Sequence, residues 1–386
     1  MATYKTPGVY VEEISKLPPS VAHEPTSVAV FIGYTEIVTG KNGDDLKLKP
    51  VQCRSLPDYI AAFGETPGER FLYDSVNMFY NNGGGDCYII SVGEFNEPVL
   101  LSDLQNGLNS SKEVPAQLLL IPDACLLPEQ DFSLLQQKML QLCSQRQDRF
   151  AILDTLIPTD DPENDFQTFR AGIGNYNLKW GAAYYPWLIL TDNKPVPPSG
   201  AIAGIYAQVD TSRGVWKAPA NISLNGINEI AVHINAGQQD NMNVDAGSGK
   251  SINAIRFFTG KGFMVWGSRT LAGNDNEWRY VPVRRFFTMV EQSVKKSTGW
   301  AVFEPNDANT WVKIEAEIEN FLTVLWRSGA LAGAKPEHAF YVNIGLNKTM
   351  TAVDILEGNL IIEIGLAVVR PAEFIILRFS HKTVAS

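Results

Sequence analysis

The hydrophobic and polar positions divide the first half of the chain into two kinds of segment. Short apolar runs typical of buried strands occupy residues 27–34, 86–92, 117–122, 149–155 and 182–190. Between them, segments with apolar residues at helical spacing occupy 55–63, 70–81, 100–109, 128–145 and 163–176. Strands that alternate with helices predict a largely parallel or mixed sheet with helices packed on it. We therefore predict a mixed α/β fold.

The second half begins with residues 191–250, which are rich in Pro, Gly, Asn and Ser and predict loops or junctions. The run "FMVWGSRTL" then predicts a buried strand, and "VPVRRFFTMVEQSVKKS" predicts a helix with Pro282 at its start. A second helix is expected over 309–327, with Asp307 or Asn309 as its N-cap and Gly329 as its stop. Its apolar face consists of Trp311, Ile314, Ile318, Phe321, Leu322 and Leu325. Strands near 339–344, 359–369 and 373–380 close the chain.

Both ends of the sequence contain a short β-type run. Near the start, "GVYVEE" is followed by two prolines, which suggests an arm over residues 1–20. Near the end, "FIILRF" is apolar on both faces, and such a strand needs to be covered on both faces. It either folds back through the turn-forming "RPAE" as a hairpin, or pairs with a neighbouring molecule.

Composition narrows the possible functions. The 386 residues suggest two or three domains. A formal charge of −10 argues against a nucleic-acid partner. The chain has no apolar run of about 18 residues, so no membrane insertion is expected, and its beginning does not resemble a signal peptide. The four cysteines are far apart and favour a reducing compartment over a disulfide scaffold.

Motifs for chemistry are weak. The segment "AGSGKS" at 246–251 resembles part of a phosphate-binding loop, but Val244 occupies the position of the first glycine, so an exposed loop is favoured. Gly83, Gly84 and Gly85 precede a strand and indicate a helix stop. The four histidines share no ligand spacing, and the carboxylates of Asp160, Asp161, Glu163 and Asp165 lack the pattern of a calcium loop. We expect no enzyme activity, no cofactor and no metal site.

Aromatic residues gather between Trp266 and Phe303 and are interleaved with arginines. Such a pattern can stack nucleic-acid bases, but the acidity of the chain opposes that interpretation. A packed core with arginine side chains lying over aromatic rings is the better prediction.

The longest blocks of this half carry a specific resemblance. The segment from "INAIRFFTGKGFMVWGSRTL" through "GWAVFEPND" resembles the signature block of contractile tail sheath proteins, and "NFLTVLWRSGALAGAKPEHAFYVNIG" and "GNLIIEIGLAVVRPAEFIILRF" continue it in order. "TPGVYVEEI" and "RGVWKAPAN" are also similar to the family. The resemblance covers residues 1–35 and about 200–380 strongly, and 36–200 loosely. Contractile phage tails, R-type bacteriocins, extracellular contractile injection systems and type VI secretion use such sheaths.

The resemblance implies that subunits polymerise helically around an inner tube and contract to drive it through a target envelope. It implies donated strands at both ends, received by a sheet of a neighbour that includes 359–369. The donated residues would be Val9, Tyr10, Val11 and Glu12, and Phe374, Ile375, Ile376, Leu377, Arg378 and Phe379. The implied organisation is an arm over 1–20, an outer α/β domain over 21–200, an inner sheath domain over 201–370 and an arm over 371–386.

The expected partners are copies of the chain itself, the tube protein, and baseplate and terminator proteins. The polar side of the helix at 309–327 is the candidate tube-facing surface, with Lys313, Glu315, Glu317, Glu319 and Arg327 on or beside it. Both arms lie on one chain, which favours a phage-tail-like or extracellular particle, assembled in the bacterial cytoplasm, over the type VI form. The alternative is a non-contractile baseplate or terminator component built on the same domain.

Overall fold

The computed structural model of the chain describes residues 21–40, 43–66 and 68–374. The chain divides into two compact units. Of the described residues, the large unit contains those of Glu24–Gln292 and residues 368–374, and the small unit contains Ser293–Ala367 together with residues 21–23. The chain passes from the large unit into the small one within a single helix, α8 (Val281–Ser297).

A nine-stranded sheet forms the centre of the large unit, in the order β2-β3-β1-β4-β5-β6-β11-β12-β9. The six strands from β3 to β11 are parallel, whereas β2, β12 and β9 are antiparallel at the edges. The strands are β1 (Ala29–Thr35), β2 (Val51–Cys53), β3 (Cys87–Glu94), β4 (Leu118–Leu120), β5 (Phe150–Asp154), β6 (Gly181–Tyr185), β9 (Ile222–Ser223), β11 (Ile252–Phe258) and β12 (Gly262–Val265). The predicted mixed α/β fold is confirmed.

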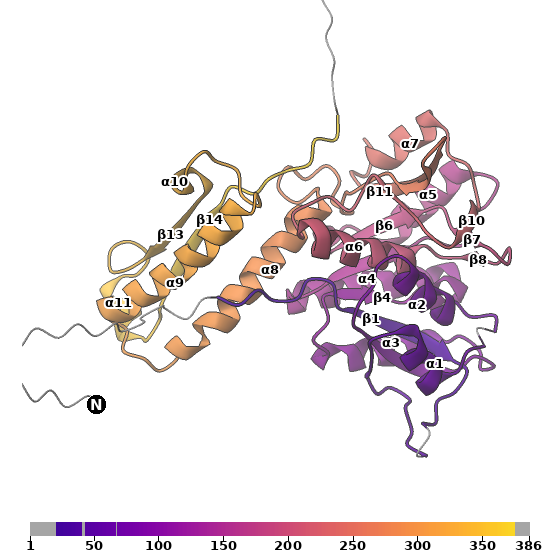
Figure 1. The fold of residues 1–386 in the computed structure, drawn as a ribbon, viewed down its shortest axis with the longest axis horizontal. Coiled ribbons are helices and arrows are strands. Elements are labelled where there is room, and N and C mark those ends of the chain that lie inside the picture. Colours follow the sequence, from indigo (N-terminus) through magenta and orange to yellow (C-terminus); the bar gives the residue numbers. More distant parts are fainter. Residues whose placement is uncertain (1–20, 41–42, 67, 375–386) are drawn as a thin grey trace, which may run out of the picture. The chain divides into compact units, whose positions relative to one another are not determined.

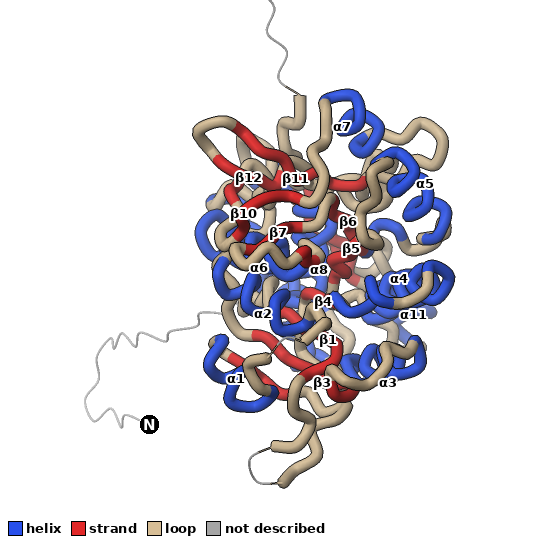
Figure 2. Tube along the Cα trace, turned by 90° about the vertical axis from the view of Figure 1, so that its right-hand side faces the viewer, coloured by secondary structure: helices blue, strands red, loops and turns tan. Residues whose placement is uncertain are grey.

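Helices cover both faces of this sheet (Figure 1). Figure 2 shows α2 and α6 on one side of the strands and α3, α4 and α5 on the other. Besides α8, the helices of the large unit are α1 (Leu56–Phe63), α2 (Leu72–Asn81), α3 (Leu101–Ser110), α4 (Glu129–Arg146), α5 (Pro162–Gly172), α6 (Ser199–Arg213) and α7 (Ala236–Asn243). Short 3-10 turns, η1 (Ser111–Glu113), η2 (Pro122–Leu126) and η3 (Leu178–Trp180), join several of them.

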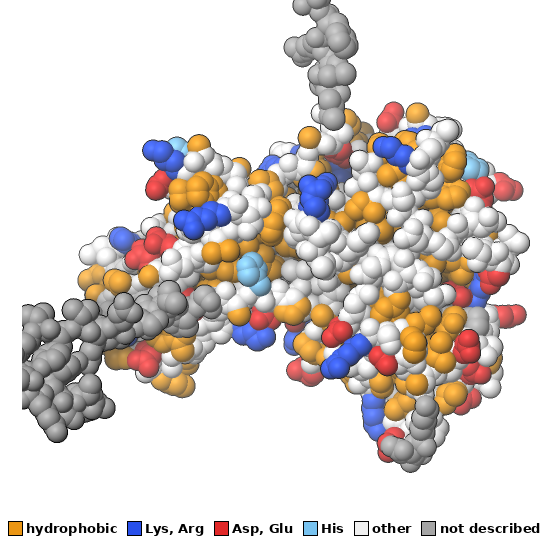
Figure 3. Space-filling view, viewed as in Figure 1, with side chains coloured by type: hydrophobic (Ala, Val, Ile, Leu, Met, Phe, Trp, Pro, Cys, Tyr) orange, Lys and Arg blue, Asp and Glu red, His pale blue; other side chains and the backbone are white. Residues whose placement is uncertain are grey.

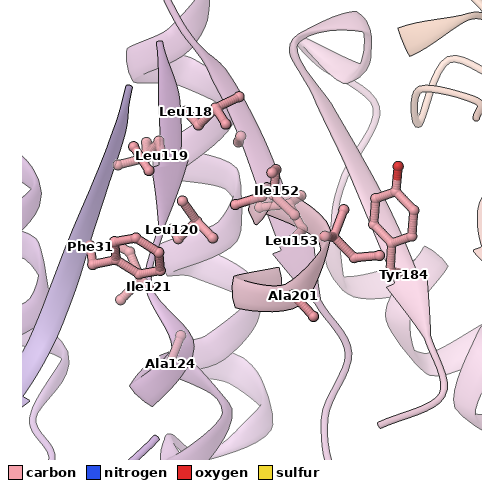
Figure 4. Close-up of a cluster of buried hydrophobic side chains, with 14 of the residues drawn as sticks. Phe31, Leu118, Leu119, Leu120, Ile121, Ala124, Ile152, Leu153, Tyr184 and Ala201 are labelled. Atoms are coloured by element: carbon pink, nitrogen blue, oxygen red, sulfur yellow. The ribbon is translucent and has the colours of Figure 1, made fainter. Parts of the chain in front are cut away.

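The core of the large unit is apolar on both faces of its central strands. Leu118, Leu119 and Leu120 of β4 are completely buried, and Ile152 and Leu153 of β5 lie beside them (Figure 4). A parallel strand covered on both faces needs such a continuous apolar run, and this is why the sequence pattern located these strands.

The region expected to be loops contains additional elements. Helix α6 begins at Ser199, and α7, β9 and a three-stranded sheet of β7 (Leu188–Leu190), β8 (Pro195–Val196) and β10 (Ile227–Ile230) fall wholly or partly in residues 191–250. Nearly every side of α6 is buried, so its sequence has no amphipathic periodicity to reveal a helix. The strand expected over 182–190 is two strands, β6 and β7, separated at Pro186, which has no backbone N–H to donate.

The expected domain boundary between residues 200 and 201 does not coincide with a division of the structure. It falls in the first turn of α6, which packs on α2 and on β5. The two compact units divide instead after Gln292.

The small unit is built from α9 (Ala308–Arg327), the hairpin of β13 (Phe340–Ile344) and β14 (Ile362–Leu366), and short helical segments. These are η4 (Thr298–Ala301), α10 (Pro336–Ala339) and α11 (Ala352–Leu356). The Asp307 side chain caps α9 and Gly329 ends it with a φ of 83°, both as predicted. Within the described ranges, no helix is long and apolar enough to cross a bilayer.

Candidate assembly interface

The hairpin of the small unit pairs β13 and β14 in antiparallel register, with Val342 opposite Ile364. One face of the hairpin is packed by α9, which buries Val342 and Ile344. On the other face the Tyr341 hydroxyl group donates a hydrogen bond to the Glu363 carboxylate at 2.8 Å. The hairpin therefore has an apolar inner face and a polar outer face, as a half-buried sheet requires.

The described residues add no third strand to this hairpin. The inner-face residues Ile362, Ile364 and Leu366 of β14 remain half-exposed, whereas Val342 and Ile344, which pair with two of them on β13, are buried. A hollow of about 610 Å³ lies at the start of β14, with Ile314, Leu360 and Ile362 among its lining residues. The hairpin thus presents unpaired backbone groups beside uncovered apolar side chains, which is the surface that an added strand needs.

The predicted arm residues lie almost entirely outside the described part of the chain. Val9, Tyr10, Val11, Glu12 and the run from Ile375 to Phe379 are in this group. Phe374 is described, belongs to no strand, and its side chain is 69% exposed. The donation of these segments remains a prediction.

The candidate tube-facing residues lie on α9, and the structure separates them. Lys313, Glu319 and Arg327 are exposed, and Glu315 is half-buried. Burial and the nearby Glu315 carboxylate both raise the pKa of Glu319, and Lys348 opposes them. These residues share the exposed face with Val312 and Val324, so the face is mixed rather than purely charged.

Glu317 departs from the sequence prediction. It was expected on or beside the polar side of the helix, but its side chain is only 2% exposed. Its carboxylate accepts a hydrogen bond from the Trp300 indole N–H at 3.1 Å. Glu317 lies at the border of the two faces, and η4 covers it, which periodicity alone does not predict.

The segment "AGSGKS" is a loop that leads into β11, so the order of elements is opposite to that of a phosphate-binding loop. The loop is less exposed than expected, because Lys250 is buried and its ammonium group donates to the Arg170 carbonyl oxygen at 2.6 Å. In the described ranges no cluster of His, Cys, Asp or Glu could hold a metal ion. Of the four clustered carboxylates, Asp161 caps α5 and Asp165 accepts from the Thr159 hydroxyl group.

The arginines of the aromatic block pack over rings, as predicted. The guanidinium carbon of Arg284 lies 4.4 Å from the Trp180 ring centroid and 4.3 Å from that of Trp278. Burial lowers the pKa of Arg284, and Glu291, which accepts two hydrogen bonds from it, opposes this effect. On the face drawn in Figure 3, the acidic and basic side chains of the described residues are interspersed, unlike the basic stripe of a nucleic-acid-binding surface.

Sequence reasoning missed one group of contacts, in which the Glu373 carboxylate docks on Arg269 of the large unit. The two residues are 104 positions apart. In the sequence, Glu373 is the last residue of the turn-forming segment "RPAE", and no local pattern links it to Arg269.

Two family models match the chain in order. The phage tail sheath protein central domain matches residues 102–271, and the phage tail sheath C-terminal domain matches residues 273–382.

Solved structures are similar over nearly the whole chain. The sheath complex of PVC, an extracellular contractile injection system, in its contracted state is 36% identical over 99% of both chains, with a TM-score of 0.79. The helical sheath of the anti-feeding prophage in its contracted state is 34% identical over 98% of this chain and 100% of that one, with a TM-score of 0.78.

The tail sheath protein of Enterobacteria phage T4 is 25% identical over 301 residues, which are 66% of this chain and 44% of that protein. The chain spans less than half the length of the curated phage relatives it matches. Sheath proteins of this kind are structural, which confirms the expectation of a protein that is not an enzyme. The chain belongs to the tail sheath family of contractile phage tails and phage-tail-like injection particles.

Proposed function

We propose that this chain is the repeating subunit of a contractile sheath, which polymerises helically around an inner tube and shortens to drive the tube through a target envelope. The observation that carries the proposal is the likeness, over 99% of both chains, to a sheath solved in its contracted state. Assembly takes place in the bacterial cytoplasm, and baseplate and terminator proteins bind the two ends of the sheath.

Subunits are linked by strands donated from the two ends of the chain to the β13–β14 hairpin of neighbours. The unpaired hairpin edges, the half-exposed Ile362, Ile364 and Leu366, and the hollow at the start of β14 support this part of the proposal. Strand addition supplies a row of backbone hydrogen bonds, so the linkage is strong while subunits move as rigid bodies.

Contraction takes its energy from greater burial between subunits in the contracted state, and no nucleotide is consumed. The burial of Lys250 supports this, because its ammonium group is engaged by a backbone carbonyl oxygen rather than available to a phosphate. An ATP hydrolysis rate that follows contraction would contradict this part of the proposal.

The tube is held by the exposed face of α9. Glu315 and Glu319 are one helical turn apart on this helix, and like charges at that spacing repel each other. A basic side chain on the tube would relieve the repulsion. Such exposed contacts are individually weak, which suits a surface that must release the tube.

Negative-stain electron microscopy of the purified full chain, beside a version that ends after Phe374, tests assembly. The truncation keeps every contact of the described residues, so its effect reports on residues 375–386 alone. We expect tubes from the full chain and none from the truncation. If the full chain and the truncation form tubes equally well, C-terminal strand donation is excluded as a requirement for assembly. If neither forms tubes, the baseplate or terminator alternative is favoured.

A further inference from the structure

Glu373 makes an unusually complete set of contacts for a residue outside regular structure. Its carboxylate accepts hydrogen bonds from Arg269 Nη2 at 2.6 Å and from Arg269 Nε at 2.9 Å. It also accepts one from Asn243 Nδ2 at 2.9 Å and one from the Tyr280 hydroxyl group at 3.2 Å. A two-pronged arginine–carboxylate pair fixes both distance and orientation.

The three donors come from three different segments of the large unit. Asn243 ends α7, Arg269 follows β12, and Tyr280 immediately precedes α8. Arg269 and Tyr280 are joined by an antiparallel bridge, and the Arg269 guanidinium group also donates to the Gly273 carbonyl oxygen at 3.0 Å. The receiving group is therefore held in place by the body of the large unit.

Burial strengthens these contacts. The Arg269 side chain is 4% exposed and that of Glu373 is 20% exposed, so solvent screens the pair poorly. Burial by itself would raise the pKa of the Glu373 carboxyl group, but the hydrogen bonds from Arg269, Asn243 and Tyr280 outweigh it and leave the pKa below its ordinary value.

The position of Glu373 in the chain gives these contacts their significance. Ala367 still belongs to the small unit, where its backbone forms hydrogen bonds with the backbones of Ala332 and Ala339. Residues 369–374 have no regular structure, and the segment proposed for donation begins with Phe374, directly after Glu373. Glu373 is therefore a point at which this part of the chain is fixed to the large unit before the segment begins.

We propose that Asn243, Arg269 and Tyr280 form an anchor for Glu373 that fixes, on the large unit, the point from which the C-terminal segment departs toward a second copy of the chain. Force on a donated strand then enters the large unit at Arg269 instead of pulling on β14 of the small unit. The inference rests on the proposed sheath function, and it assigns a positioning role to four residues.

A spin label at position 374 tests the anchor in unassembled subunits. The four native cysteines are buried, so a Phe374→Cys variant presents one accessible thiol. We expect a slow-motion spectrum with Glu373 present and sharper, fast-motion lines after Glu373→Gln or Arg269→Lys. Glu291→Gln is the matched control, because Glu291 also accepts two hydrogen bonds from a buried arginine, Arg284, of the same unit. Spectra that do not change with Glu373→Gln would overturn the anchor.

Assembly of chains with the native Phe374 provides the second readout. We expect Glu373→Gln to raise the protein concentration needed for tube formation by about tenfold, the effect of losing one charge-assisted interaction. Glu291→Gln should leave this concentration unchanged. If Glu373→Gln is poorly soluble, Tyr280→Phe and Asn243→Ala each remove one hydrogen bond and should give smaller shifts in the same direction.

The two proposals fail in different ways. In one outcome the native chain forms tubes, and Glu373→Gln assembles at the same protein concentration and contracts in the same way. This outcome would overturn the anchor and leave the proposed sheath function unaffected. The opposite result is a spin label that becomes mobile in Glu373→Gln subunits while the native chain forms no tubes. That result would support the anchor contact and count against the sheath function.

Discussion

The indole N–H of Trp300 donates a hydrogen bond to the buried carboxylate of Glu317, at 3.1 Å. This contact joins η4 to the middle of α9 and removes Glu317 from the surface that could meet the tube. A carboxylate that is buried and hydrogen-bonded stabilises its own subunit, whereas an exposed one is available to a partner.

Glu317 and Glu319 should therefore respond differently to substitution. Glu317→Gln keeps an acceptor for Trp300 and should leave tube co-purification unchanged, whereas Glu317→Ala should lower the free energy of unfolding by about 1–3 kcal/mol. Glu319→Lys should reduce tube co-purification with little effect on unfolding. Urea unfolding and pull-down with the tube protein measure the two effects, and equal tube binding by Glu319→Lys would remove α9 from the tube interface.

The crossing of α6 and α2 gives a second prediction. A Cβ atom at Gly200 would lie 2.2 Å from the Ser75 carbonyl oxygen, and one at Gly204 would lie 2.5 Å from that of Phe79. Gly200→Ala should destabilise the chain by about 1–3 kcal/mol, although alanine is the better helix former by about 1 kcal/mol.

Gly237 in α7 is the control for this substitution, because a Cβ atom there would meet only the Asn235 side chain, at an ordinary 3.5 Å. Gly237→Ala should raise the free energy of unfolding by about 0.5–1 kcal/mol. A loss at both positions would show that backbone contact with α2 is not the cause.

The ion pair of Arg285 and Asp210 gives a third prediction. Both side chains are buried, and Arg285 also donates to the Thr26 carbonyl oxygen and lies over the Tyr206 ring. Asp210→Ala leaves a buried charge without its partner and should cost about 3–5 kcal/mol. The double variant Asp210→Leu with Arg285→Met should lose less than the sum of the single variants. Additive losses in urea unfolding would contradict a coupled pair.

Asp154 predicts a pH dependence. Burial raises the pKa of its carboxyl group to about 7, with hydrogen bonding from Ser199 in opposition. Between the unfolded pKa of about 4 and about 7, the folded chain keeps a proton that the unfolded chain has lost. The contribution of this proton to the free energy of unfolding is at most about 4 kcal/mol. It is fully present below about pH 4 and is lost as the pH rises through 7.

Unfolding at pH 5 and pH 7 measures this effect. Asp154→Asn should reduce the fall in stability between the two values, and substitution of the exposed Asp44 by Asn should not. A fall of the same size in Asp154→Asn would exclude Asp154 as its source. Asp123, whose pKa burial raises to about 6, should account for part of the fall that remains.

The sequence predicted those helices that are buried on one face only and those strands that are buried on both faces. Leu118–Leu120 is covered on both faces, and α9 has one apolar stripe, so their patterns were clear. Helix α6 was missed because it is small-residue-rich and buried on nearly every side. The burial of Glu317 depends on η4, and the pairing of Glu373 depends on a residue 104 positions earlier. Local pattern carries no information about either contact.

The separation between Glu373 and Arg269 in the sequence also determines the order in which the two partners are synthesised. A ribosome makes Asn243, Arg269 and Tyr280 first, then all of Ser293–Ala367, and only then Glu373. The large unit can therefore fold while the guanidinium group of Arg269 still lacks its carboxylate. On the proposed strand exchange, the C-terminal segment of a nascent subunit therefore becomes available only after the residues of both compact units have been synthesised.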